Sequence, residues 1–241
     1  MDLNRRTQQI WLWGGVLSIL AFTIGWVGCA HFLPPIAPSH SADQVAHTFA
    51  SRRTGIRFGA LIMIVGTMFW IPFAAVLAAL PRKAKGSRPV DAWIQVGSAV
   101  VGAAVIIIAM MFWVLACFRP ERDPELTQTL VDAGFMFSIM PFAIFVIWNL
   151  GLTMAIVNDT SEHPAYPRWA AYFNVWCAIL YLPGGALAFF HTGVFAWNGL
   201  LAFYLPAGAF FVWILVMSWL ANEALKRPTL EEAVVRELVT T

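Results

Sequence analysis

Residues 92–118 read AWIQVGSAVVGAAVIIIAMMFWVLACF and contain no Asp, Glu, Lys or Arg. A helix needs about 20 apolar residues to cross the hydrocarbon core of a bilayer, and this stretch exceeds that length. Within the core the backbone must satisfy its own hydrogen bonds, which a continuous α-helix does. The stretch therefore predicts a membrane-spanning helix.

Five further stretches share this length and this absence of charge. The six predicted spans are residues 10–33, 58–80, 92–118, 133–157, 169–190 and 195–221. Only 12% of the 241 residues are charged and 60% are hydrophobic, whereas soluble proteins have about 25% charged residues. The sequence therefore predicts an all-α polytopic membrane protein, with a bundle of six transmembrane helices in residues 1–222 and a cytoplasmic tail in residues 223–241.

The distribution of basic residues predicts the orientation, because Lys and Arg are retained on the cytoplasmic side during insertion. The basic residues on the side of both termini are Arg5, Arg6, Arg82, Lys83, Lys85, Arg88, Arg168, Lys226, Arg227 and Arg236. Those on the other side are Arg52, Arg53, Arg57, Arg119 and Arg122. We therefore expect both termini in the cytoplasm. The net charge of +2 is too small and too dispersed to indicate nucleic-acid binding.

The first outer loop is expected to contain a short helix. Ser41 and Gln44 have the spacing of a capping box, in which each side chain binds the backbone N–H of the other residue. The apolar residues that follow recur at helical spacing: Ala42, Val45, Ala46, Phe49 and Ala50. Such a face predicts an interfacial helix in the outer headgroup layer.

Six residues are candidates for binding a ligand. Arg119 and Arg122 offer donors to a phosphate or carboxylate, although the neighbouring carboxylates offer an internal alternative. Asn149 and Asn174 lie at similar depths, where an interhelical hydrogen bond is the more common role of such amides. Trp197 and Asn198, at the start of the sixth span, complete the set.

A second group of candidates consists of metal ligands on the predicted outer face. These residues are His31, His40, Asp43, His47 and His191. Imidazole and carboxylate groups bind zinc or copper, and a histidine pair binds haem iron. However, histidines are also ordinary residues at headgroup level, and no spacing here matches a metal motif. No cofactor is therefore assigned, and the three cysteines do not form a CxxC pair.

The absence of charge within the predicted spans argues against several classes of protein. Ion-coupled carriers and proton pumps use carboxylates or lysines inside the membrane, and rhodopsins need a lysine for retinal. The chain also lacks the GxxxxGK[ST], GxSxG and HExxH motifs.

Three segments resemble a group of small six-span bacterial membrane proteins. They are residues 118–125 (FRPERDPE), the run from Pro167 to Asn174, and residues 195–199 (FAWNG). The resemblance covers most of the chain and implies a location in the bacterial inner membrane. The group has no established activity, so the resemblance implies nothing about catalysis.

Three prolines suggest where a binding site would lie. Pro141, Pro183 and Pro206 are expected to kink the fourth, fifth and sixth spans at similar depth in the outer half of the membrane. Kinks between aromatic, uncharged helices favour a cavity for a hydrophobic molecule such as a lipid, sterol or quinone. The alternatives are an accessory subunit that packs against other membrane subunits and, third, an enzyme or a metal or haem protein with its site on the outer face.

Overall fold

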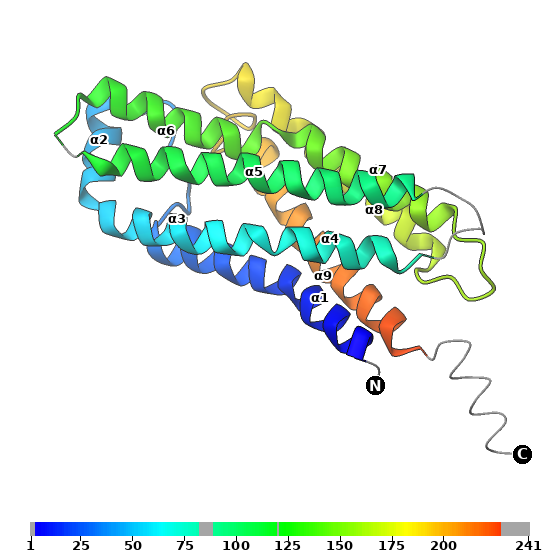
Figure 1. The fold of residues 1–241 in the computed structure, drawn as a ribbon. Helices are drawn as coiled ribbons and strands as arrows, with labels where there is room; N and C mark the ends of the chain where they lie inside the picture. The colour runs from blue at the N-terminus through cyan, green and yellow to red at the C-terminus, as the bar shows by residue number, and fades with distance from the viewer. Residues whose placement is uncertain (1–2, 82–88, 120, 228–241) are drawn as a thin grey trace, which may run out of the picture.

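The structure is a computed structural model that describes residues 3–81, 89–119 and 121–227. Within these residues, six helical stretches are long and apolar enough to cross a membrane (Figure 1). They are Asn4–Cys29, Arg53–Ala79, Val90–Phe118, Pro124–Val157, Arg168–Ala188 and Leu200–Lys226. The chain is therefore an all-helical, multi-pass membrane protein, and this part of the sequence prediction is confirmed.

Most of the spans are assembled from two helical pieces. The first five elements are α1 (Leu3–Phe22), the π-helix η1 (Thr23–Cys29), α2 (Ala42–Ser51), α3 (Arg53–Met68) and α4 (Trp70–Ala79). The others are α5 (Val90–Phe118), α6 (Pro124–Ile139), α7 (Phe142–Val157), α8 (Arg168–Tyr181), the 3-10 helix η2 (Leu182–Ala188), the π-helix η3 (Leu200–Tyr204) and α9 (Leu205–Lys226). In the described part of the chain, only α5 crosses as one uninterrupted α-helix. The sixth span begins at Leu200, five residues later than expected, after an irregular segment at residues 189–199. From residue 228 onward, the predicted tail lies outside the described residues.

Proline accounts for four of the breaks. A proline has no N–H to donate, and its ring clashes with the carbonyl group four residues earlier. Pro72 follows the break between α3 and α4, and Pro141 lies between α6 and α7. Pro183 lies in η2, and Pro206 follows η3. Each of the three prolines expected to kink spans four to six therefore lies at an interruption of the regular α-helix.

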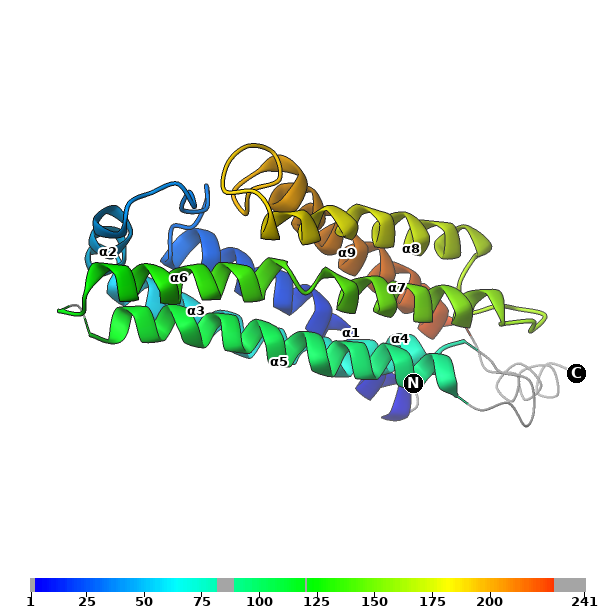
Figure 2. The same cartoon turned by 90° about the horizontal axis from the view of Figure 1, so that it is seen from above.

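The two ends of the bundle differ (Figures 1 and 2). One end, called the α2 end, carries α2 and the segment 30–41; α1 begins and α9 finishes at the opposite end, called the terminal end. The segment 189–199 is joined to the segment 30–41 by a hydrogen bond of 2.7 Å from Trp197 Nε1 to the carbonyl oxygen of Ile36. The assignment of the terminal end to the cytoplasm stays a prediction.

The short helix in the first loop forms as predicted, with the Ser41–Gln44 capping box. Its surroundings differ from the expectation, because Val45 and Phe49 are buried in the protein. Phe49 packs on Phe32 at 5.8 Å between ring centroids, and α6 runs beside the helix. The apolar face of α2 therefore covers the bundle instead of lying against lipid.

The first and second spans approach closely at glycines. A Cβ atom added to Gly59 would lie 2.4 Å from the carbonyl oxygen of Gly25, and one added to Gly25 would lie 2.6 Å from the carbonyl oxygen of Gly59. Small residues at helix contacts let backbones approach and pack closely in membranes. This contact fixes η1 against α3.

The Gly59→Ala substitution is therefore expected to destabilise the protein, by about 1–3 kcal/mol, because the added methyl group forces two backbones apart. Gly97→Ala is the matched control, since nothing lies within 4 Å of a Cβ at that position in α5. Thermal unfolding of both variants in detergent measures the difference. A midpoint for Gly59→Ala as high as that for Gly97→Ala would contradict the close contact.

Candidate functional site

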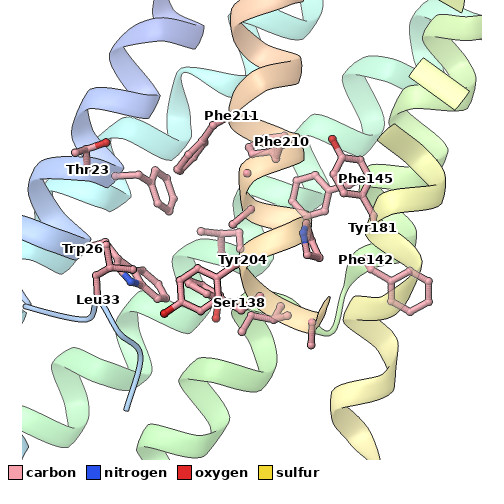
Figure 3. A pocket seen from close by; sticks show the side chains of 18 of the residues that line it. Thr23, Trp26, Leu33, Ser138, Phe142, Phe145, Tyr181, Tyr204, Phe210 and Phe211 are labelled. Atoms are coloured by element: carbon pink, nitrogen blue, oxygen red, sulfur yellow. The ribbon is translucent and has the colours of Figure 1, made fainter. Parts of the chain in front are cut away.

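A cavity of about 340 Å³ lies inside the bundle, where four spans depart from the regular α-helix (Figure 3). Its walls come from η1, the α6–α7 junction, the end of α8, and η3 with the start of α9, together with parts of α4 and α5. The lining residues are Phe22, Thr23, Trp26, Val27, Leu33, Trp70, Ile106, Met110, Ser138, Ile139, Phe142, Phe145, Tyr181, Ala202, Phe203, Tyr204, Pro206, Ala207, Gly208, Phe210 and Phe211.

The position of the cavity follows from the local backbone. A π turn is wider than an α turn, and a proline bends the helix axis, so side chains on such segments do not interdigitate as they do between regular helices. In η1, for example, Ala30 N donates to the carbonyl oxygen of Gly25, five residues earlier, at 2.9 Å. Irregular segments from separate spans meet at this level, and the space between them remains open.

The cavity has a buried aromatic floor and a mouth on the outside of the bundle. Phe210 forms the centre of the floor, with its ring centroid 5.0 Å from those of both Trp70 and Phe145. Leu33 and Tyr204, which also line the cavity, are exposed. Tyr204 belongs to the sixth span, and the outer surface of a spanning helix faces lipid, so we expect the mouth to open towards the bilayer. None of the lining residues is charged.

Most polar groups in the wall already have partners within the protein. Two hydroxyls donate to backbone carbonyl oxygens of their own helices: Thr23 to Ile19 at 2.9 Å and Ser138 to Phe135 at 2.8 Å. Two indoles also donate: Trp26 to the carbonyl oxygen of Phe32 at 2.7 Å, and Trp70 to the hydroxyl of Ser18 at 3.2 Å. These groups therefore present little hydrogen-bonding capacity to a ligand.

Among the buried residues of the wall, the hydroxyl of Tyr181 is the exception. The residue is 3% exposed, and its oxygen has no hydrogen-bond partner in the structure. The Asn149 side chain lies close enough to interact with this hydroxyl, but the two groups do not meet the geometry of a regular hydrogen bond, and Asn149 Oδ1 also has no partner. Buried unpaired groups occur at Gln95, Trp148 and Ser218 as well, but those residues do not line the cavity. Tyr181 is thus the buried, unpaired polar group in the described wall of the cavity.

The six ligand candidates from the sequence lie outside this cavity. Arg122 Nη1 donates to the carbonyl oxygen of Leu115 at 3.0 Å, and within the described residues no ion pair joins Arg119 or Arg122 to the neighbouring carboxylates. Trp197 stacks on Phe135, with ring centroids 5.5 Å apart, and Asn198 is half-buried beside it. The tryptophan therefore has a structural role in this region.

The two asparagines do not bind each other as expected. Asn174 Oδ1 accepts a hydrogen bond of 2.7 Å from Trp213 Nε1, and its amide nitrogen donates to the carbonyl oxygen of Ala170 at 2.7 Å. Asn149 Nδ2 donates to the carbonyl oxygen of Phe145 within its own helix at 3.0 Å. Asn174 thus connects α8 to α9, and Asn149 lies behind the cavity wall at Tyr181.

The metal candidates do not gather into a site. Within residues 3–81, 89–119 and 121–227, no group of three His, Cys, Asp or Glu side chains is placed to hold a metal ion. The five candidates, all exposed, are His31, His40, Asp43, His47 and His191. His191 has an acidic neighbour in Asp132, and Cys29 and Cys117 are free thiols. The common location predicted for these residues therefore does not produce a ligand set.

Comparison of the chain with protein-family models, curated proteins and solved structures finds no match. The assignment of this cavity as the candidate site therefore depends on its geometry alone. In the sequence, only the prolines indicated the depth at which the cavity lies. The contribution of the first span was missed because η1 contains no proline. Tyr181 was missed because a tyrosine at a helix end looks like an ordinary interfacial residue.

The absence of a partner for the Tyr181 hydroxyl can be tested by measuring the stability of variants. Tyr181→Phe removes a buried group that binds nothing and is expected to leave the empty protein as stable as before, or about 1 kcal/mol more stable. Asn174→Leu, in contrast, leaves the indole of Trp213 unpaired and is expected to cost about 1–3 kcal/mol. Unfolding midpoints in ligand-free detergent distinguish the two, and a large loss for Tyr181→Phe would show that its hydroxyl is bonded after all.

Proposed function

We propose that this membrane protein binds a hydrophobic molecule from the bilayer, of the lipid, sterol or quinone type, in the cavity beside Tyr181. The observation that carries the proposal is an unpaired hydroxyl deep inside an otherwise apolar cavity. In the bilayer interior an unpaired polar group costs several kcal/mol, so a ligand oxygen that bonds to it gains an interaction that the protein does not supply.

The dimensions and the mouth support such a ligand. A volume of about 340 Å³ lies at the lower end of the range of small-molecule sites, which is about 300–1,000 Å³. The lateral opening lets a long apolar tail remain among the lipids while the polar head reaches Tyr181. Aromatic walls without charge suit an uncharged ring or chain with one oxygen at its head.

The other functions considered from the sequence have less support. An accessory subunit would be expected to expose apolar surface, but lipid covers the exposed apolar side chains of a spanning bundle equally well. A metal or haem site on the outer face has only scattered, exposed candidates. The location in a bacterial inner membrane, with cytoplasmic termini, belongs to the proposal and rests on the distribution of basic residues and on the resemblance described above.

Blocking the mouth tests the proposal. Gly208 lines the cavity, and nothing lies within 4 Å of a Cβ added to it, so the ring of Gly208→Phe has room at the opening. We expect this variant to weaken saturable binding of decylubiquinone or of a photoreactive sterol at least about tenfold, because the two ligands compete with the ring for space. Gly97→Phe, which is equally unhindered but outside the cavity, is expected to bind like the parent protein.

The proposed hydrogen bond between Tyr181 and the polar head of the ligand is tested separately with Tyr181→Phe. Loss of one hydrogen bond is expected to weaken binding of the better probe by about three- to tenfold, while the folded protein keeps its stability. Binding of both probes that is linear with concentration, as in simple partition into detergent, would overturn the proposal, as would equal affinities for the Gly208→Phe and Gly97→Phe variants.

A further inference from the structure

A second cavity, of about 380 Å³, lies at the terminal end of the bundle. One wall is the loop between α7 and α8, including Pro164, and the other is the last turns of α9. The loop is held in place by Tyr166, whose hydroxyl donates to the carbonyl oxygen of Leu77 at 3.2 Å. Burial raises the pKa of Tyr166 above its ordinary value, so the hydroxyl remains a donor at neutral pH.

Two arginines line this cavity. Arg227 Nη1 donates to the carbonyl oxygen of Pro164 at 2.9 Å, and Arg168 Nη1 donates to the carbonyl oxygens at the end of α7. These bonds hold the guanidinium groups beside the cavity, and a guanidinium has five N–H donors in all. The acidic lining residue, Glu223, is paired with Lys226 at 2.6 Å. The lining residues therefore carry a net positive charge. Asp159, next to Ala165 and Arg168, is buried, and its carboxylate accepts hydrogen bonds from Ser161 and from the N–H of Ala165.

The cavity also lies at the membrane boundary. α8 begins at Arg168 and α9 ends at Lys226, so both walls belong to the ends of spanning helices. Two lining tryptophans on the same two helices are exposed, Trp169 by 47% and Trp219 by 57%. Exposed indoles at the ends of spans are typical of the headgroup level, where one edge of the ring meets water and the other meets lipid.

We propose that this second cavity is a binding site for an anionic phospholipid. Its phosphate binds the guanidinium groups of Arg227 and Arg168 through charge-assisted hydrogen bonds, and its acyl chains run along Trp169 and Trp219. The site is independent of the cavity at Tyr181, because it lies at the other end of α8 and shares no lining residue with it.

Native mass spectrometry of the full chain in detergent tests this site. With phosphatidylglycerol and phosphatidylcholine added in equal amounts, we expect the parent protein to retain the anionic lipid preferentially. Arg227→Gln is expected to reduce that retention about tenfold, because it removes charge-assisted bonds to the phosphate. Arg122→Gln is the matched control, since Arg122 also donates one exposed hydrogen bond to a backbone carbonyl, but at the α2 end.

Three outcomes would overturn the proposal of an anionic phospholipid site. Equal retention of the two lipids by the parent protein would show no preference for the anionic headgroup. Equal losses in Arg227→Gln and Arg122→Gln would show that overall charge, and not this cavity, holds the lipid. Displacement of phosphatidylglycerol by inorganic phosphate at similar concentration would show that the arginines bind a free anion without recognising a lipid.

Discussion

In the interior of a bilayer, a backbone N–H or C=O that loses its helical partner has no water to replace it. The rest of this structure depends on that constraint. Each span must remain helical wherever it faces lipid, and each proline that interrupts the ladder must be accommodated by another hydrogen-bonding pattern. The chain accommodates its prolines with a π turn in η3, a 3-10 segment in η2 and short junctions elsewhere, and the first span adds a π turn in η1 that has no proline.

The same constraint explains why the main cavity is where it is. Irregular turns are permitted in a membrane when neighbouring helices surround them, so breaks in different spans tend to gather in the protein interior. Here they gather around Phe210 and Tyr181, with the first span contributing η1. The arrangement that satisfies the backbone leaves a side-chain hydroxyl unpaired, and that contrast is the physical basis of the proposed binding site.

Close packing elsewhere holds this irregular region in place. The glycine contact between η1 and α3 brings two backbones together, and Trp197 connects two segments far apart in the sequence through its bond to Ile36. Aromatic rings fill the remaining space, as where Phe135 stacks on Trp197. A cavity can persist in a bundle only where the surrounding contacts are too tight to collapse into it.

The sequence by itself determined the six spans, the capped helix at Ser41 and the level of the kinks, because each depends on local composition or on the chemistry of one residue. The hydrogen-bond partners and packing neighbours of individual side chains were decided by the tertiary structure alone. Asn174 binds Trp213 in place of Asn149, and the apolar face of α2 covers protein instead of lipid. The exposed histidines remain apart, while Tyr181 reaches the cavity without a partner. Such outcomes depend on how helices rotate and pack against each other, and in a bundle that is apolar on nearly every face, no periodic pattern in the sequence specifies that rotation.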